Sequence, residues 1–223
     1  MSQASLSSSI STQGFHFTVS TTVNVASWQE SGQCSLHVLH DLDPHVYADQ
    51  YELAQRPGYT SALWGSSDLE RPVSAVDQAG SVLLLTADSS HLFPGQAANI
   101  TLEVPLHARY GRPVAGAQDA YHMIELKRPV GFFACSLDHV TPVPDALRQY
   151  TSLSGWPSLS LSLIPDTSPR AGLKMVVPVG KLDDLPWVDV GTAAVMITMF
   201  FYLLVASIRT ARRLFSKPSM KTD

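Results

Sequence analysis

The chain has 223 residues, 45% of them hydrophobic and 15% charged, which allows one domain with a hydrophobic core and one additional segment. Its formal net charge is −4, but residues 209–223 hold five of the fifteen Lys and Arg residues and one acid, so the remaining chain has ten basic and eighteen acidic residues. This acidic body excludes the nucleic-acid-binding class, because neutralising phosphates requires a basic surface.

The N-terminal segment, residues 1–13, reads MSQASLSSSISTQ. A secretory signal would combine a basic start with an apolar stretch of about 7–15 residues. No Lys or Arg precedes Arg56, so the segment lacks the pattern of a signal peptide. We predict that residues 1–13 are disordered.

The body of the chain shows strand patterns. Residues 15–25 alternate between apolar and polar side chains, as a half-buried strand does, and residues 99–107 repeat the alternation. Further strands are predicted at residues 34–39, 82–87, 121–126, 131–136 and 173–179. Residues 141–170, rich in Pro, Ser and Thr, are predicted to form a long loop with at most one short strand. Because no sustained helical period occurs here, the pattern predicts a mainly β fold, with a β-sandwich-like domain over residues 14–182.

Residues 190–208 read VGTAAVMITMFFYLLVASI and carry no charge. As a helix this segment would rise about 28 Å, close to the ~30 Å thickness of bilayer hydrocarbon. Trp187 and Asp189 precede it, and Arg209 follows it directly. Since positive charge is retained in the cytoplasm, we predict one transmembrane helix, a basic cytoplasmic tail at residues 209–223, and the β-rich domain on the opposite side. A core helix of a soluble protein is the less favoured alternative.

Two features of the body are typical of an oxidising, glycosylating compartment. Asn99 begins an N-glycosylation acceptor and falls on the polar face of its predicted strand, so we predict a glycan there; an unmodified surface residue is the less favoured alternative. The cysteines, Cys34 and Cys135, are predicted to point inward on separate strands. They could form a disulfide or remain two buried thiols, because the sequence gives no distance between them.

Patterns that could support catalysis are weak. His37 and His40 have an HxxH spacing, but on a strand the two side chains lie on opposite faces and do not converge on one metal ion. We interpret them as structural surface histidines. Residues 41–43 match the DxD pattern of many glycosyltransferases, but they precede a proline and are interpreted as a turn. We therefore predict no catalytic residue, cofactor site or metal site.

Three segments resemble elements of the PIG-X family. Residues 45–53 resemble its YVDPYEL element, with Gln50 in place of the usual Pro. Residues 104–113 are similar to its PxHxRYxxP element, and residues 177–180 to its closing VPVG, so the resemblance covers about residues 14–208. The residues that carry it are Tyr47, Asp49, Tyr51, Glu52, Leu53, Pro105, His107, Arg109, Tyr110, Pro113 and Pro178.

The resemblance implies a glycoprotein of the endoplasmic reticulum membrane, with a lumenal domain, one span and no catalytic residue of its own. PIG-X proteins bind and stabilise the multispanning catalytic subunit of GPI mannosyltransferase I, which transfers mannose from dolichol-phosphate-mannose to the GPI-anchor precursor. We expect the motif residues to serve the fold or this partner. For Arg109, the expectation is either an ion pair with Asp49 or Glu52, or a contact with an acidic loop of the partner.

Two other functions stay open on the residues alone. A β-sandwich with one span is also typical of cell-surface adhesion proteins and receptors, which surface labelling of intact cells would detect. A tail-anchored protein with its domain in the cytosol would account for the missing signal pattern. That second alternative predicts no glycan on Asn99.

Overall fold

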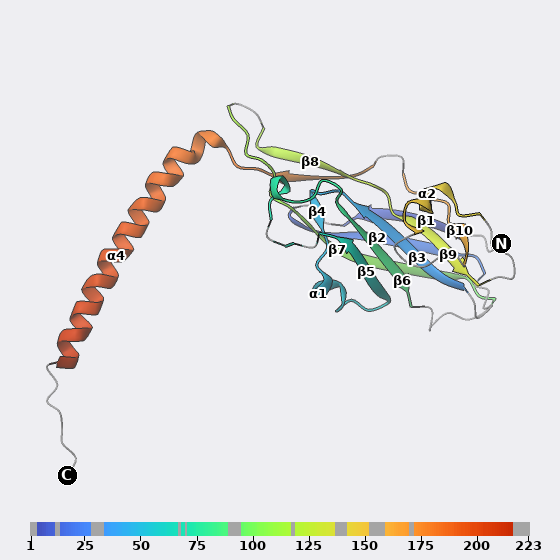
Figure 1. The fold of residues 1–223 in the computed structure, drawn as a ribbon, viewed down its shortest axis with the longest axis horizontal. Helices are drawn as coiled ribbons and strands as arrows, with labels where there is room; N and C mark the ends of the chain where they lie inside the picture. The colour runs from blue at the N-terminus through green and yellow to red at the C-terminus, as the bar shows by residue number, and fades with distance from the viewer. Residues whose placement is uncertain are drawn as a thin grey trace, which may run out of the picture. The chain divides into compact units, whose positions relative to one another are not determined.

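Figure 1 shows a computed structural model of the chain, which describes residues 4–11, 14–27, 34–66, 68–69, 71–88, 95–116, 119–136, 142–151, 159–169 and 172–215. The chain divides into two compact units. The first comprises Met1–Arg112 and Tyr121–Val179, and the second comprises Pro113–Ala120 and Gly180–Asp223. The strands belong to the first unit, and the long C-terminal helix belongs to the second.

Two antiparallel sheets and a two-stranded ribbon make up the first unit. The first sheet has the order β1 (Ala4–Ile10), β2 (His16–Val25), β7 (Ala98–Ala108) and β4 (Val46–Tyr47). The second sheet has the order β10 (Ser160–Leu163), β9 (Val130–Cys135), β3 (Cys34–Leu42), β6 (Ser81–Ala87) and β5 (Tyr59–Gly65). The ribbon pairs β11 (Leu173–Pro178) with β8 (Tyr121–Leu126). Short helices are α1 (Gln50–Leu53), η1 (Val73–Ala75) and α2 (Asp145–Arg148).

The two sheets bury one main core between them, which confirms the predicted mainly β, sandwich-like fold. Phe17 and Val104 from the first sheet, Leu36 and Leu85 from the second, and Met175 from the ribbon belong to this single buried cluster. Burial alternates along β2, as the period-two pattern of its sequence predicts. Non-directional burial of apolar area across the two sheets is therefore what holds the first unit together.

A second, smaller cluster covers the other face of the second sheet. Leu147 and Tyr150, from the α2 segment, pack there with Leu39 of β3, Leu84 of β6 and Phe132 of β9. The middle parts of these strands are consequently buried on both faces, and β6 and β9 carry short apolar runs instead of an alternating pattern. The predicted loop at residues 141–170 thus contains α2 and, as the one short strand anticipated, β10.

The N-terminal prediction is wrong where the structure describes this segment, because residues 4–10 form β1. All seven residues of β1 pair with β2, and Leu6 is buried in the main core. On the other side of β1, the Leu6 amide donates to the Pro165 carbonyl at 2.9 Å, and the Thr167 amide donates to the Leu6 carbonyl at 2.7 Å. The strands β4 and β5 were also not predicted. Pairing with neighbouring segments therefore overrides a serine-rich composition.

The interpretation of His37 and His40 as surface residues is also wrong. They lie on opposite faces of β3, as predicted, but both are buried. His37 contacts the Ser35 hydroxyl at 2.6 Å and the Thr86 hydroxyl at 3.0 Å. Burial disfavours the charged imidazolium and lowers the pKa of each histidine to about 4. Both are neutral core residues.

The second unit contains η3 (Leu182–Asp184) and α4 (Leu185–Phe215), a helix of 31 residues. Helical structure over 182–215 contains an apolar window whose mean hydropathy is 2.0 and whose side chains are not buried. The predicted segment 190–208 therefore lies in a helix that is long and apolar enough to cross a membrane. The Thr198 hydroxyl donates to the Ala194 carbonyl at 2.7 Å, which satisfies this polar group inside the helix.

Candidate functional site

Strand pairing brings the first two family-like segments together, although they lie about sixty residues apart in the sequence. The two residues of β4 pair with the end of β7, so that Tyr47 lies opposite His107 and Val46 lies opposite Ala108. The Arg109 amide then donates to the His45 carbonyl at 2.7 Å and extends the pairing. We refer to Tyr47, Glu52, His107 and Arg109 as the motif cluster.

His107 occupies the centre of the motif cluster. Its ring stacks on Tyr47, with centroids 5.0 Å apart and planes 13° apart, and meets His16 of β2 edge-on at 4.4 Å. Its Nε2 lies 2.9 Å from the Glu52 carboxylate, which also accepts from the Arg56 guanidinium at 3.3 Å. These contacts attach α1 to β7, so His107 and Glu52 serve the packing of the motif segments on each other.

Arg109 does not form the expected ion pair with Asp49 or Glu52, which is a correction to the sequence prediction. Its side chain is only 4% exposed, and one terminal nitrogen donates to the carbonyls of Asp68 and Arg71, the latter at 3.0 Å. The guanidinium carbon also lies 4.5 Å from the centre of the Tyr47 ring. Burial lowers the pKa of Arg109. The side chain therefore holds the backbone at Asp68 and Arg71 against the sheet.

The helix α1 explains three motif residues and the one substitution. Asp49 is the N-cap, and its carboxylate accepts from the Tyr51 amide at 2.8 Å. Leu53 is buried in the main core. Gln50 is the first helical residue, where a proline costs nothing because its missing N–H would have no partner in the helix. Replacing the usual Pro by Gln at this position is thus compatible with the same helix start.

Two motif tyrosines are exposed beside the buried cluster. Tyr51 on α1 is 79% exposed, and Tyr110, just after β7, is 69% exposed. The Tyr110 ring lies 4.8 Å from the Phe15 ring, a contact that supports its position. Since aromatic side chains are enriched at the centres of protein interfaces, these two residues are candidates for contact with a partner.

The remaining motif residues are prolines, and the structure does not bring them into the cluster. Pro105 is buried in β7, at a position to which β4 does not extend, so its missing N–H breaks no pairing with that strand. Pro178 ends β11 and is exposed. Pro113 belongs to the second unit, where the neighbouring Val114 amide donates to the Gly180 carbonyl at 2.9 Å.

An open hollow of about 240 Å³ borders the motif cluster. Its lining includes the side chains of His16, Glu52, Arg56 and His107. In this hollow, the Glu52 carboxylate contacts both His107 and Arg56. The hollow can therefore hold a polar side chain of another molecule, bound by hydrogen bonds to these groups. Within the described ranges, no group of three or more His, Cys, Asp or Glu residues is placed to hold a metal ion.

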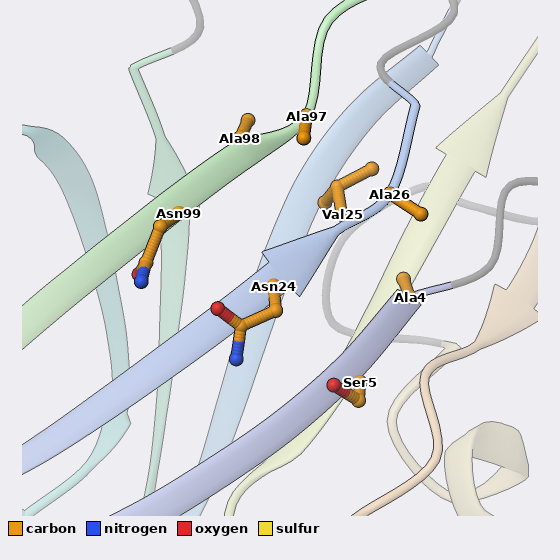
Figure 2. A pocket seen from close by; sticks show the side chains of 8 residues that line it. All are labelled: Ala4, Ser5, Asn24, Val25, Ala26, Ala97, Ala98 and Asn99. Atoms are coloured by element: carbon orange, nitrogen blue, oxygen red, sulfur yellow. The ribbon is translucent and has the colours of Figure 1, made fainter.

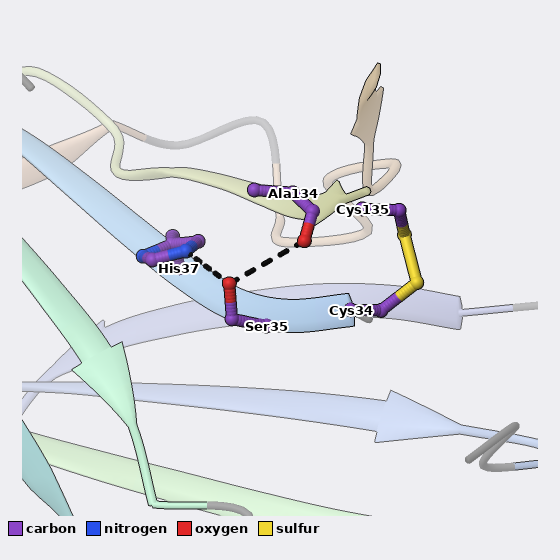
Figure 3. Close-up of a disulfide and its surroundings, with 5 residues drawn as sticks. All are labelled: Cys34, Ser35, His37, Ala134 and Cys135. Atoms are coloured by element: carbon purple, nitrogen blue, oxygen red, sulfur yellow. Dashed lines mark hydrogen bonds between the residues drawn. A yellow bond between two sulfur atoms is a disulfide. The ribbon is translucent and has the colours of Figure 1, made fainter. Parts of the chain in front are cut away.

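A disulfide joins Cys34 of β3 to Cys135 of β9, which the sequence had left open (Figure 3). The two residues are register partners on neighbouring strands, and Ser35 beside them donates to the Ala134 carbonyl at 3.4 Å. The bridge spans 101 residues of sequence. In the chain-entropy model, closing a loop of this length stabilises a fold by about 4–5 kcal/mol.

Asn99 is exposed on β7, at the end of the first sheet. Figure 2 shows Asn99 and its register partner Asn24 on the same side of the two strands. They line a hollow of about 480 Å³ whose other walls include the small residues Ala4, Ser5 and Ala98. The acceptor asparagine is thus accessible and surrounded by space.

The DxD pattern was predicted to form a turn, but Asp41 and Leu42 end strand β3, and only Asp43 belongs to the turn that follows. The Asp41 carboxylate accepts from the Tyr150 hydroxyl at 2.8 Å and from Lys127 at 2.7 Å. Burial, together with this hydrogen bond, raises the pKa of Tyr150 to about 12. Asp43 accepts from the His45 amide at 3.0 Å and closes the turn. Both carboxylates therefore have structural partners.

Two residues that contact the motif cluster, Arg56 and His16, were not identified from the sequence. Arg56 lies four residues after Glu52, and this spacing on a helix is a signal that could have identified the ion pair. His16 carries no such signal, because its contact with His107 depends on the register between β2 and β7.

Comparison with known proteins gives one family and several relatives. The sequence model described as PIG-X / PBN1 matches residues 12–208. The protein pbn1 of Schizosaccharomyces pombe is 29% identical over 182 residues, which cover 78% of this chain and 50% of that protein. The protein pbn1 of Aspergillus oryzae is 30% identical over 168 residues, which cover 68% of this chain and 30% of that protein. The chain thus spans half or less of the length of these curated relatives.

Proposed function

The chain belongs to the PIG-X / PBN1 family, and on this premise we propose that it is a non-catalytic stabilising subunit of the GPI mannosyltransferase I complex. In this proposal, its partner is the multispanning catalytic subunit of the complex in the endoplasmic reticulum membrane. That enzyme transfers the first mannose from dolichol-phosphate-mannose to the GPI-anchor precursor. The chain itself contributes binding surface and no cofactor.

The observation that carries the proposal is how the motif residues are used. Glu52, His107 and Arg109 make their polar contacts within the domain, to each other's elements or to backbone carbonyls. Tyr51 and Tyr110 instead present their rings to solvent. A buried polar framework that presents exposed aromatic side chains is the arrangement of a docking surface, in which the framework supplies rigidity and the aromatics supply contact area.

The topology in this proposal places the β-rich domain in the lumen and the tail in the cytoplasm. Arg209 and Arg212 follow the apolar part of α4, whereas Asp183 and Asp184 precede it. Positive charge is retained on the cytoplasmic side, so these flanks favour a lumenal domain. Exposure of Asn99 and the bridge between Cys34 and Cys135 support the same compartment, where glycans are attached and disulfides persist.

Co-purification from membranes in mild detergent tests the proposal. The tagged full chain is expected to retain the multispanning mannosyltransferase subunit, identified by mass spectrometry. A Tyr51→Lys, Tyr110→Lys variant is expected to retain at least about tenfold less, since each charge must be desolvated at the contact. Leu163→Lys, at a residue of β10 that is 41% exposed and lies outside the motif segments, serves as the control and should retain a normal amount. Absence of this enzyme from the wild-type preparation would refute the proposal.

The same preparation tests the topology. Endoglycosidase treatment is expected to shorten the wild-type chain by the mass of one glycan, and the shift is expected to disappear in Asn99→Gln. Protease added to sealed microsomes should remove the tail and spare the domain. A sugar-free chain whose domain is digested in sealed microsomes would contradict the lumenal orientation.

A further inference from the structure

The ribbon carries an exposed apolar face that is separate from the motif cluster. Register pairs Tyr121 with Pro178 and Met123 with Val176 on the same side of β8 and β11. Tyr121 is 65% exposed, Met123 is 61% exposed and Val176 is 42% exposed, and Pro178 is exposed as well. We refer to these four residues as the ribbon face. The opposite side of the ribbon holds Ile124, Leu126, Leu173, Met175 and Val177, all in the main core.

The stability of the fold does not explain why the ribbon face is apolar, because alternate residues of a strand lie on opposite sides of the ribbon. A ribbon buried on one side requires apolar residues only at every second position. The outward positions of β8 and β11 are free to be polar, and the pair Glu125 and Lys174 at the other end of the ribbon is charged, with 3.9 Å between its groups. Apolar side chains at the outward positions near Tyr121 and Pro178 therefore contribute little to the stability of the isolated domain.

Charge distinguishes a protein partner from a lipid surface. Anionic headgroups attract Lys and Arg, whereas the ribbon face has no basic residue of its own. The nearest cation along the same side, Lys174, is paired with Glu125. In addition, Lys181, Asp183 and Asp184 follow shortly after the ribbon, and their summed negative charge gives no attraction to anionic lipids. Tyr and Met are instead enriched in the cores of protein interfaces.

The position of the face in the chain indicates the kind of protein. The apolar end of β11 is Pro178, seven residues before α4 begins at Leu185, whereas the charged pair lies at the other end. The face offers on the order of a few hundred Å², less than the roughly 800 Å² per partner of a standard stable interface. A contact of this size persists only where a second attachment raises the effective concentration. Residence of α4 in the same membrane would provide that attachment.

We propose that the ribbon face docks an apolar extramembrane segment of a membrane-embedded partner. This inference rests on the proposed function, in which the partner is the multispanning subunit of the mannosyltransferase. The contact at the ribbon face is additional to the one at Tyr51 and Tyr110. The span holds the two proteins in one membrane, and the ribbon face covers an apolar segment of the partner that would otherwise be exposed to water.

Photo-crosslinking of the full chain in native membranes tests this inference. Benzoylphenylalanine in place of Met123 is expected to give an adduct with a multispanning protein, identified by mass spectrometry, at least about fivefold above the yield from the same probe at Leu163. A Tyr121→Lys, Val176→Lys background should reduce that adduct at least about fivefold. Because both side chains are exposed, this background should leave the midpoint of thermal unfolding unchanged.

Each remaining outcome separates the inference from the proposed function. An adduct only with lipid or with a second copy of this chain, or equal yields at Met123 and Leu163, would overturn the inference even if the mannosyltransferase co-purifies. An adduct with a different multispanning protein would overturn the assignment of the ribbon face to the mannosyltransferase subunit, whereas the proposed function itself fails only if that subunit is absent from the co-purified material.

Discussion

The buried histidines predict that the domain loses stability in mild acid. His40 is 3% exposed, and burial lowers its pKa to about 4, against 6.5 in the unfolded chain. Between these two values the unfolded state binds a proton that the folded state does not, so stability is fully present above about pH 6.5 and is lost as the pH falls toward 4. At pH 5 the difference amounts to about 2 kcal/mol for one such histidine, from ~1.4 kcal/mol per pKa unit. His37 shares the direction and adds a comparable loss.

Replacing His40 by leucine isolates its contribution. The Nε2 of His40 is buried without a hydrogen-bond partner in the described part of the chain, so a leucine of similar volume leaves this site without a new unsatisfied group. Urea unfolding of the full chain in detergent, followed by tryptophan fluorescence at pH 7.5 and pH 5, measures the loss. We expect about 4 kcal/mol in the wild type and about 2 kcal/mol in His40→Leu. The exposed His16→Leu serves as the control and should behave as the wild type. Equal losses in the wild type and His40→Leu would refute the reasoning.

Three further predictions concern stability at neutral pH, measured by the same unfolding assay. Arg109→Ala leaves two carbonyls without their donor and should cost about 2–3 kcal/mol, with no effect at all contradicting its anchoring role. Replacing Cys34 and Cys135 together by alanine should cost up to about 4–5 kcal/mol, and dithiothreitol should then have no further effect. Both Gly58 and Gly80 have positive φ, so alanine at either position should cost about 1–2 kcal/mol of backbone strain. Gly80→Ala should destabilise by more than Gly58→Ala, because a Cβ at Gly80 would also collide with a carbonyl of β3. Equal costs at the two glycines would disprove the collision.

Local patterns predicted the elements whose environment is simple. Residues 15–25 alternate because β2 faces the main core on one side only. The run at 190–208 was predicted as a helix because its length and composition match a bilayer, and it lies within α4. The predicted ends of both major alternating strands agree with the structure within one residue.

Elements that depend on distant partners were not predictable in the same way. β1 is a strand because β2 and the segment around Pro165 supply its hydrogen bonds, and nothing in its serine-rich sequence indicates either partner. His37 is buried because the second cluster covers the outer face of the sheet, whereas His40 lies on the face of β3 that packs into the main core, and a strand pattern alone reveals neither cover.

The candidate site shows the same division. The family-like segments identified its residues, and the cap formed by Asp49 follows from local helix chemistry. The partners of Arg109 are backbone carbonyls, however, and carbonyls have no sequence signature. The ion pair of Arg109 with Asp49 or Glu52 was therefore a reasonable expectation from charge, and tertiary structure decided against it.

The lifetime of the mannosyltransferase subunit tests the central claim most directly. In cells that lack this chain, pulse-chase labelling is expected to show a shortened half-life of that subunit with an unchanged transcript level. Re-expressed wild-type chain should restore the half-life, and the Tyr51→Lys, Tyr110→Lys variant should not. A half-life that stays the same with and without the chain would contradict the stabilising role.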